Sequence, residues 1–287
     1  MTETAKIITF QGHPGAYSDI ACRAAYPDMT SLPSHTFEDA FRTVREGKAE
    51  LAMIPIENTV AGRVADIHHL MPNSGLHIIG EHYQRVNHHL LGLEGARLDQ
   101  LTHVHSHVHA LSQCRNLIRE LGLQAVVHVD TAGAAAMIAE KGDPTQAAIA
   151  SELAAKIDGL TSLKANIEDA ETNTTRFLVL SREPIQPPLD GPKCVTTFIF
   201  HVKHVPAALY KALGGFATNK INMTKLESYL VGGHFVAAQF YADVEAHPDE
   251  EGMKYAFDEL RFFTKDVTIL GTYPAHPYRF MVPSEYL

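Results

Sequence analysis

The sequence lacks several features that would assign it to a common functional class. Its 287 residues carry 24 Lys and Arg against 33 Asp and Glu, so it has no basic excess of the kind that nucleic-acid binders show. Cys22, Cys114 and Cys194 are far apart and form no CxxC pair, which excludes a disulfide framework and favours a reducing compartment. The sequence shows no signal peptide and no apolar run of membrane-spanning length, so we expect a cytoplasmic protein without membrane or nucleic-acid partners.

The common nucleotide-binding and nucleophile motifs are also missing. Residues 12–15 read Gly-His-Pro-Gly, but no Gly-Lys-Ser/Thr follows them, and the chain has no GxGxxG. No Ser or Cys has an obvious general base beside it. An anionic ligand would therefore have to be held by a few well-placed side chains and backbone N–H groups.

Histidine, by contrast, is frequent, with 18 residues. Four of them alternate, at His103, His105, His107 and His109. In an extended segment all four would share one face, at a spacing that can bind Zn or Ni. The stretch runs into a helical pattern, however, which would splay the later histidines, and no carboxylate or thiolate is near in sequence. We therefore expect no dedicated metal site.

Residues 6–181 alternate strand-like and helix-like segments, which is typical of an α/β domain. We expect strands at 6–10, 51–56, 76–80, 87–93, 125–129, 147–150 and 177–180. We expect helices at 18–25, after Thr36, and at 64–71, 110–121, 131–140 and 151–157. Four prolines within residues 183–192 then predict a linker. Beyond it the pattern is βαββαβ, a ferredoxin-like split unit, with elements at 195–202, 207–217, 221–230, 234–244, 251–264 and 267–271.

The segment Asn173-Thr174-Thr175-Arg176-Phe177 is the most informative stretch of the chain. An apolar run that reads as a buried strand begins at Phe177. An arginine entering such a strand is costly unless an anion meets it. Two interpretations are equally supported by this segment alone: a docking site for a carboxylate or phosphate, or an arginine–carboxylate pair that holds two elements together.

Four other segments place small polar groups where a strand ends or a helix begins. They are residues 12–18, 54–59, 130–131 and 150–151. Ligands of open α/β sheets bind outside the carboxyl ends of strands, where helix N-termini point their N–H groups. Serine and threonine at such places are usually plain helix caps, so each loop alone is weak support. Together with Arg176 they predict an anion pocket with little formal charge.

These segments, in this order, resemble those of the prephenate dehydratases. The matching stretches are residues 11–18 (QGHPGAYS), 54–62 (IPIENTVAG), 130–135 (DTAGAA), 147–151 (AAIAS) and 173–177 (NTTRF). Residues 208–211 (ALYK) through 222–228 (NMTKLES) resemble the ACT regulatory domain that these enzymes carry. The resemblance covers nearly the whole chain.

The resemblance implies a two-lobed α/β catalytic domain similar to a type II periplasmic binding protein, followed by a ferredoxin-like ACT domain. The catalytic domain would span residues 1–183, with one lobe of about 1–80 plus 168–183 and the other of 81–167. A linker at 184–193, the ACT domain at 194–275 and a tail at 276–287 would follow. The implied reaction converts prephenate to phenylpyruvate, water and CO2 on the way to phenylalanine, with no metal or organic cofactor.

In the family, the threonine of the Thr-Arg-Phe motif is the residue most closely tied to catalysis, which here is Thr175. We expect Thr175 to donate a hydrogen bond to the leaving hydroxyl, Arg176 to hold a carboxylate through its paired donors, and Phe177 to form a wall beside the ring. Further candidate substrate ligands, for each of which capping or loop fixing is an equal alternative, are Asn58, Thr59, Thr131, Ser151 and Asn173.

The sequence departs from the family pattern in two regions. His107-Val108-His109 stands where His-Pro-Gln is usual, and Glu227-Ser228-Tyr229-Leu230 where Glu-Ser-Arg-Pro is usual. Ala207 also replaces a usual glycine. The resemblance still predicts phenylalanine as an effector, bound between regulatory domains paired in a homodimer or homotetramer, and its ligands would be Ala208, Leu209, Asn222, Glu227 and Ser228. The alternatives are an arogenate dehydratase or a non-catalytic sensor of amino acids or keto acids.

Overall fold

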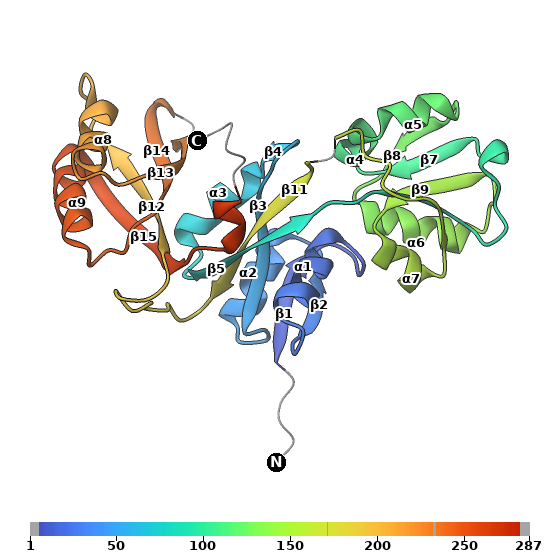
Figure 1. Ribbon diagram of the computed structural model, residues 1–287, viewed down its shortest axis with the longest axis horizontal. Coiled ribbons are helices and arrows are strands. Elements are labelled where there is room, and N and C mark those ends of the chain that lie inside the picture. Colours follow the sequence, from blue (N-terminus) through green and yellow to red (C-terminus); the bar gives the residue numbers. More distant parts are fainter. Residues whose placement is uncertain (1–5, 171, 232–233, 282–287) are drawn as a thin grey trace, which may run out of the picture. The chain divides into compact units, whose positions relative to one another are not determined.

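The computed structural model describes residues 6–170, 172–231 and 234–281 (Figure 1). Contacts divide the chain into two units, each assembled from separated segments. The first combines Met1–Ile67 with His82–Leu178, and the second combines His68–Glu81 with Val179–Leu287. These units are described separately below, and the domain boundaries expected at 183 and 193 stay a prediction. Within the described residues, no helix is long and apolar enough to cross a membrane.

A six-stranded sheet contains the N-terminal strand. Its order is β2-β1-β3-β11-β5, with β4 paired to β3. The strands are β1 (Ile7–Gln11), β2 (Thr30–Ser34), β3 (Leu51–Asn58), β4 (Gly62–Arg63), β5 (His77–Arg85) and β11 (Thr174–Ser181). The helices in this part of the sequence are α1 (Tyr17–Ala25), α2 (Phe37–Arg45) and α3 (Ala65–Leu70). Helix α2 begins as expected, because the Thr36 side chain accepts from the Asp39 N–H at 3.0 Å and its apolar stripe is buried.

The first unit holds a second, five-stranded sheet with the order β10-β6-β9-β7-β8. Its strands are β6 (His89–Gly92), β7 (His103–Ser106), β8 (Gln124–Val127), β9 (Gln146–Ala150) and β10 (Thr161–Lys164). Four helices cover it: α4 (Val108–Gln113), α5 (Arg115–Glu120), α6 (Thr131–Lys141) and α7 (Glu152–Asp158). Figure 1 shows α4 and α5 on one side of this sheet and α6 and α7 on the other. Two separate apolar cores result, one on each face.

The second unit contains the expected βαββαβ order, which the structure confirms. The elements are β12 (Cys194–Val202), α8 (Ala208–Thr218), β13 (Met223–Val231), β14 (His234–Val244), α9 (Glu251–Phe263) and β15 (Thr264–Pro274). The sheet order β13-β14-β12-β15 is that of the ferredoxin-like split unit. Phenylalanines of β12 and β14 pack under α8 and α9, where Phe198, Phe216 and Phe257 form one aromatic cluster.

An ion cluster fixes the C-terminal segment within this unit. Arg279 lies in the short helix η3 (Pro277–Phe280) and donates from Nε and Nη2 to the two carboxylate oxygens of Glu81, at 2.6 and 2.9 Å. Asp243 lies 3.7 Å from the same guanidinium, and neither carboxylate side chain is exposed to solvent. The segment expected to be a plain tail is therefore anchored to β5 by a bidentate pair.

The structure also departs from the expected elements. The helix expected over 110–121 is two short helices, because Cys114 adopts φ −125° and ψ 29° and interrupts it. The sequence pattern does not predict strands β2, β4, β7 and β10, and it misses the first residue of β8. These segments are short and contain many polar residues. No helix or strand occurs between Ser181 and Cys194, a stretch that the structure describes in full, as its prolines predict.

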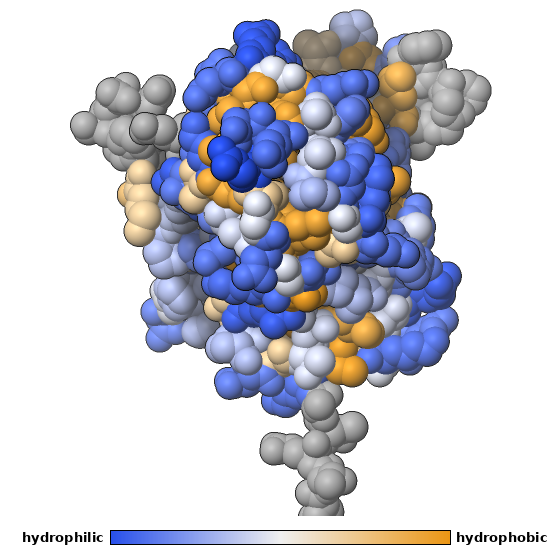
Figure 2. All heavy atoms as spheres, turned by 90° about the vertical axis from the view of Figure 1, so that its right-hand side faces the viewer, coloured by the Kyte–Doolittle hydropathy of each residue, from blue (hydrophilic) through white to orange (hydrophobic). Residues whose placement is uncertain are grey.

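Exposed apolar side chains are scattered over the surface. Figure 2 shows hydrophilic residues over most of one face, with smaller apolar areas between them. In the first unit, the most exposed large apolar side chains include Val127 and Val129, at 66 and 83%. Val129 lines the cavity described below, and single exposed apolar side chains elsewhere are normal on protein surfaces.

Candidate active site

A cavity of about 590 Å³ in the first unit collects most of the segments that the sequence singles out. Of the predicted site residues, Asn58, Thr131, Thr175 and Phe177 line it. Further lining residues come from loops and helix ends, and they include Gln11, Gly12, Tyr17, Ser18, Arg63, Asp66, His88, His107, His109, Gln113 and Asp130. Polar groups thus converge on an apolar wall that includes Phe177, which is the usual composition of a small-molecule site.

The geometry of β11 separates the roles of its residues. Side chains alternate between the two faces of a strand. Thr175 and Phe177 line the cavity, whereas Arg176, between them, does not. Thr175 is half-buried and Phe177 is fully buried. The cavity therefore receives a hydroxyl and an aromatic ring from this strand, while the arginine extends from its other side.

Asn58 at the end of β3 holds the Thr175 hydroxyl. Its side-chain oxygen accepts from the backbone N–H groups of Val60 and Ala61, at 2.9 and 2.7 Å. This fixes the amide so that Nδ2 points the other way and donates to Thr175 Oγ1 at 2.9 Å. Because an amide nitrogen only donates, the Thr175 oxygen is the acceptor and its own hydrogen is left to donate into the cavity.

A chain of hydrogen bonds continues from Asn58 to residues that sequence reasoning missed. Asn58 Nδ2 also donates to Asn173 Oδ1 at 2.8 Å, and Asn173 Nδ2 donates to Gln113 Oε1 at 2.8 Å. Gln113 Oε1 lies 2.9 Å from His88 Nε2, and His88 Nδ1 lies 3.0 Å from the Tyr17 hydroxyl. No local pattern marks Gln113, His88 or Tyr17, because they meet only through the fold.

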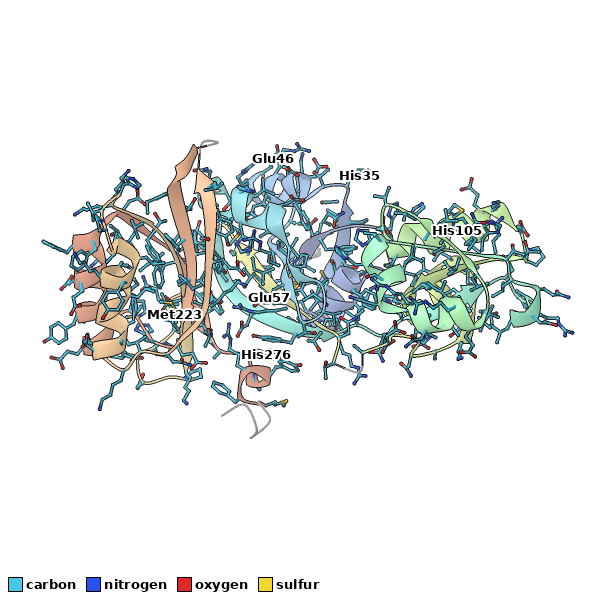
Figure 3. The ribbon with its side chains drawn as sticks, turned by 90° about the horizontal axis from the view of Figure 1, so that it is seen from above. His35, Glu46, Glu57, His105, Met223 and His276 are labelled. Carbon is cyan, nitrogen blue, oxygen red and sulfur yellow. The ribbon has the colours of Figure 1, made fainter. Side chains whose placement is uncertain are left out.

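Arg176 is 4% exposed and donates from Nη1 to Glu57 Oε1 at 2.9 Å. Glu57 lies on β3, next to Asn58 (Figure 3). This contact is the arginine–carboxylate pair that the sequence left as one of two interpretations. Binding of a substrate carboxylate by Arg176 stays a prediction.

The remaining predicted ligands lie outside the cavity or at its rim. Thr59 fixes a loop, since its hydroxyl donates to the Thr172 carbonyl at 2.6 Å and accepts from the Thr174 N–H at 2.9 Å. Ser151 caps α7 by accepting from the Ala154 N–H at 3.0 Å and donates to the Gly15 carbonyl at 2.5 Å. Thr131 begins α6 and does line the cavity.

Burial controls the ionisation of the groups around the cavity. Burial raises the pKa of Tyr17 well above its ordinary value, and the Glu168 carboxylate adds to this, so the hydroxyl keeps its proton. Burial also lowers the pKa of His88, which favours the neutral ring. The pKa of His107 is lowered by burial and by His109, against the effect of Asp130. Arg63 brings a positive charge to the cavity, and Thr131 brings the N-terminus of α6, with its partial positive charge, to the same wall.

The alternating histidines do not form one face. His103 and His105 lie in β7, and His107 directly precedes α4 (Figure 3 labels His105). The later pair is not splayed as expected, because the ring centroids of His107 and His109 are 5.1 Å apart and both residues line the cavity. Among the residues that the structure describes, no group of three or more His, Cys, Asp or Glu could hold a metal ion. Cys22, Cys114 and Cys194 are all buried and free.

The predicted effector ligands lie in the second unit. Ala208 and Leu209 begin α8, directly after Ala207, whose φ of 59° is left-handed and explains why glycine is usual there. Asn222 donates to Glu245 at 2.8 Å, and Glu227 lies 3.4 Å from Lys225. Ser228 is exposed on β13. Their role as effector ligands stays a prediction.

Comparison with known proteins places this site in a family. The family model for prephenate dehydratase matches residues 8–185. A Komagataeibacter europaeus protein described as a bifunctional N-acyl-homoserine lactone acylase/prephenate dehydratase is 53% identical, covering 96% of this chain and 98% of that protein. Arogenate dehydratase/prephenate dehydratase 1 of Arabidopsis thaliana is 38% identical, covering 93% of this chain and 71% of that protein.

A solved structure is similar along almost the same length. The prephenate dehydratase of Arthrobacter aurescens, solved in complex with L-Phe, superposes with a TM-score of 0.86 and is 29% identical, covering 94% of this chain and 90% of that one. The family match includes β3 and β11, which carry Asn58 and Thr175. The chain belongs to the prephenate dehydratase family.

Proposed function

We propose that the chain is a prephenate dehydratase, which converts prephenate to phenylpyruvate, water and CO2. The observation that carries this proposal is the Thr175 hydroxyl, which accepts from Asn58 and has its own hydrogen left to donate into the cavity. In prephenate, the C4 hydroxyl and the ring carboxylate leave together and the ring becomes aromatic. The enzyme must therefore hold a dianion and assist the departure of hydroxide.

Thr175 supplies a hydrogen bond to the departing hydroxyl. As that oxygen gains negative charge, the hydrogen bond strengthens, and the Asn58 amide stabilises the charge left on Thr175 Oγ1. Phe177 forms the apolar wall beside the ring as it becomes planar. A well-placed donor of this kind contributes about 10²- to 10⁴-fold in rate. Substrate carboxylates would be met by Arg63 and by the N-terminus of α6 at Thr131, which line the cavity. Arg176, the carboxylate ligand expected from the sequence, would have to leave Glu57 and the other side of β11 to take part.

Arogenate dehydration is the nearest alternative, because the Arabidopsis relative is described with both activities. The two substrates differ in one group, a keto oxygen against an ammonium. Asp66 and Asp130 line the cavity and could meet an ammonium. Separate assays with prephenate and arogenate, which look for phenylpyruvate and phenylalanine, distinguish the two reactions.

Acyl-homoserine lactone hydrolysis is a second activity to test, since the Komagataeibacter relative is described as bifunctional. Amide hydrolysis usually needs a nucleophile in contact with a base. Among the described cavity residues, the hydroxyls of Ser18, Thr131 and Thr175 make no hydrogen bond to a histidine. We therefore place dehydration first. The same purified chain, given an acyl-homoserine lactone, should release no fatty acid. A wild-type chain that converts neither prephenate nor arogenate would overturn the proposal.

We also propose that residues 194–275, which belong to the second unit, form an ACT regulatory domain that binds phenylalanine. Its βαββαβ topology and the L-Phe bound to the Arthrobacter relative support this. The ligands would be Ala208, Leu209, Asn222, Glu227 and Ser228, in domains paired within a homodimer or homotetramer. Titration with phenylalanine, followed by calorimetry and by activity, should show binding and inhibition, and a complete lack of binding would reject the regulatory role.

A further inference from the structure

Within the first unit, the hydrogen-bond chain that ends at Thr175 has only one consistent direction. It starts from the N–H groups of Val60 and Ala61, which can only donate, so Asn58 must present its oxygen to them and its nitrogen to the chain. Asn173 then accepts through Oδ1 and donates through Nδ2, and Gln113 accepts through Oε1. The next contact, 2.9 Å from Gln113 Oε1 to His88 Nε2, therefore requires a proton on Nε2.

The surroundings of His88 agree with that requirement. Its side chain is buried, with the residue only 2% exposed. Its Nδ1 faces the Tyr17 hydroxyl at 3.0 Å, and that hydroxyl stays protonated. The single hydroxyl hydrogen of Tyr17 is donated to the Asn87 carbonyl at 2.6 Å, so the contact with Nδ1 does not decide the tautomer. The Gln113 oxygen decides it, because it needs a donor on Nε2. The other neutral tautomer would place the lone pair of Nε2 against the Gln113 oxygen, which is repulsive.

We propose that His88 is a positioning residue for the dehydration step, because its Nε2–H fixes Gln113 and so holds the Gln113–Asn173–Asn58 chain that orients the Thr175 hydroxyl. This inference rests on the proposed function. His88 belongs to the segment just before β6, while Thr175 lies in β11, so the chain joins two sheets of the first unit at the cavity wall. Without the donor at position 88, the Gln113 side chain can move away from Asn173. Val60 and Ala61 still fix which end of the Asn58 amide faces Thr175, so the expected effect is a displaced Thr175 hydroxyl and not a turned amide.

Two amide substitutions at position 88 separate positioning from packing. In His88→Gln, the amide nitrogen occupies about the place of Nε2 and can still donate to Gln113. In His88→Asn, the amide is one carbon shorter and reaches only about the place of Nδ1. Both introduce an amide at the same buried position. A role in packing alone predicts similar effects of the two, whereas a role as donor predicts that only His88→Gln works.

The experiment measures kcat and KM of the wild-type chain, His88→Gln, His88→Asn and Tyr17→Phe with prephenate and with arogenate. We expect His88→Asn to lower kcat about 10- to 100-fold with KM changed less than about threefold, because a small misplacement of a reacting group is costly. His88→Gln should recover most of kcat. Tyr17→Phe should lose less than His88→Asn, since Nε2 can keep its proton. Thermal unfolding of each variant checks the fold.

The ¹⁵N chemical shifts of the His88 ring provide a second measurement that does not depend on turnover. They should show the proton on Nε2, and a proton on Nδ1 alone would overturn the inference. If the wild-type chain is active and His88→Asn keeps its kcat, or if His88→Gln is as impaired as His88→Asn, the positioning role is wrong while the proposed function stands. A wild-type chain inactive on both substrates overturns the proposed function and the positioning role with it.

Discussion

At the scale of single residues, the site depends on which atom donates. Thr175 is useful as a donor only because Asn58 approaches it with a nitrogen and not with an oxygen. The sequence identifies Asn58, Thr175 and Phe177 because they lie in short motifs at the end of β3 and the start of β11. It does not identify Gln113 or His88, because their contacts join residues that are far apart in sequence. Gln113 meets Asn173, 60 positions away, and His88 meets Gln113, 25 positions away.

The orientation of Asn58 can be tested by an isosteric change. In Asn58→Asp, a carboxylate still accepts from Val60 and Ala61, so the loop should persist. The carboxylate cannot donate to Thr175, which would then give its hydrogen to position 58 instead of the substrate. We expect kcat to fall about 10²-fold or more. Thr59→Val removes the contacts to Thr172 and Thr174 but leaves Asn58 Nδ2 on Thr175, and it serves as the control. An Asn58→Asp variant with the wild-type kcat would contradict this role.

The Arg176–Glu57 pair leads to a prediction about stability. Glu57→Gln removes the charge of a partner to an arginine that is 4% exposed, although Glu57 itself is 34% exposed and partly screened. We expect the free energy of unfolding to fall by about 1 kcal/mol, measured by urea denaturation. Asp99→Asn, which breaks the exposed Arg97–Asp99 pair, should have a much smaller effect. Equal effects of the two changes would argue against a structural role for the buried pair.

At the scale of elements, hydrophobic periodicity predicts the long helices and the buried strands. It fails for strands made largely of polar residues and for helix ends that are set by tertiary contacts. Strand β2 contains Pro33 and lies at a sheet edge, where a missing N–H is tolerated. Strand β7 alternates histidines and so has no apolar signal. The helix break at Cys114 is not predicted, because the apolar stripe continues on both sides of it. This break ends α4 directly after Gln113, the residue that contacts His88.

The loop before α1 packs against α7 through a glycine. A Cβ at Gly15 would lie 2.6 Å from Ala154 Cα, and the backbone has φ +86°. Gly95 has a similar φ of +80° but open space around it. We therefore expect Gly15→Ala to lower the free energy of unfolding by about 1–3 kcal/mol more than Gly95→Ala. Thermal denaturation of both variants measures this, and equal losses would show that the backbone angle alone matters.

At the scale of the whole molecule, the α/β class and the βαββαβ order follow from the sequence pattern, because repeated periodic segments leave few topologies. The division into units does not. Segment His68–Glu81 belongs to the second unit, where Glu81 pairs with Arg279, although it is far from that unit in sequence. Such a contact is a property of the folded chain and leaves no local signal.

Buried histidines should make the stability of the protein sensitive to acid. Burial lowers the pKa of His88, His105, His107 and His276 in the folded state. As the pH falls below about 6.5, the unfolded chain binds protons that the folded chain does not, so stability decreases. Urea denaturation at pH 7.5 and 5.5 should give a lower free energy of unfolding at pH 5.5, and a reduced difference in His88→Gln. Greater stability at pH 5.5 would contradict this reading of the burial.

The central claim is that Thr175 assists the loss of hydroxide from prephenate. The most direct test compares kcat/KM for prephenate in the wild-type chain, Thr175→Ser and Thr175→Ala. We predict that the wild-type chain forms phenylpyruvate, that Thr175→Ser keeps a good part of this activity, and that Thr175→Ala loses about 10²- to 10⁴-fold while its thermal unfolding is unchanged. Near-wild-type turnover by a folded Thr175→Ala variant would contradict the account.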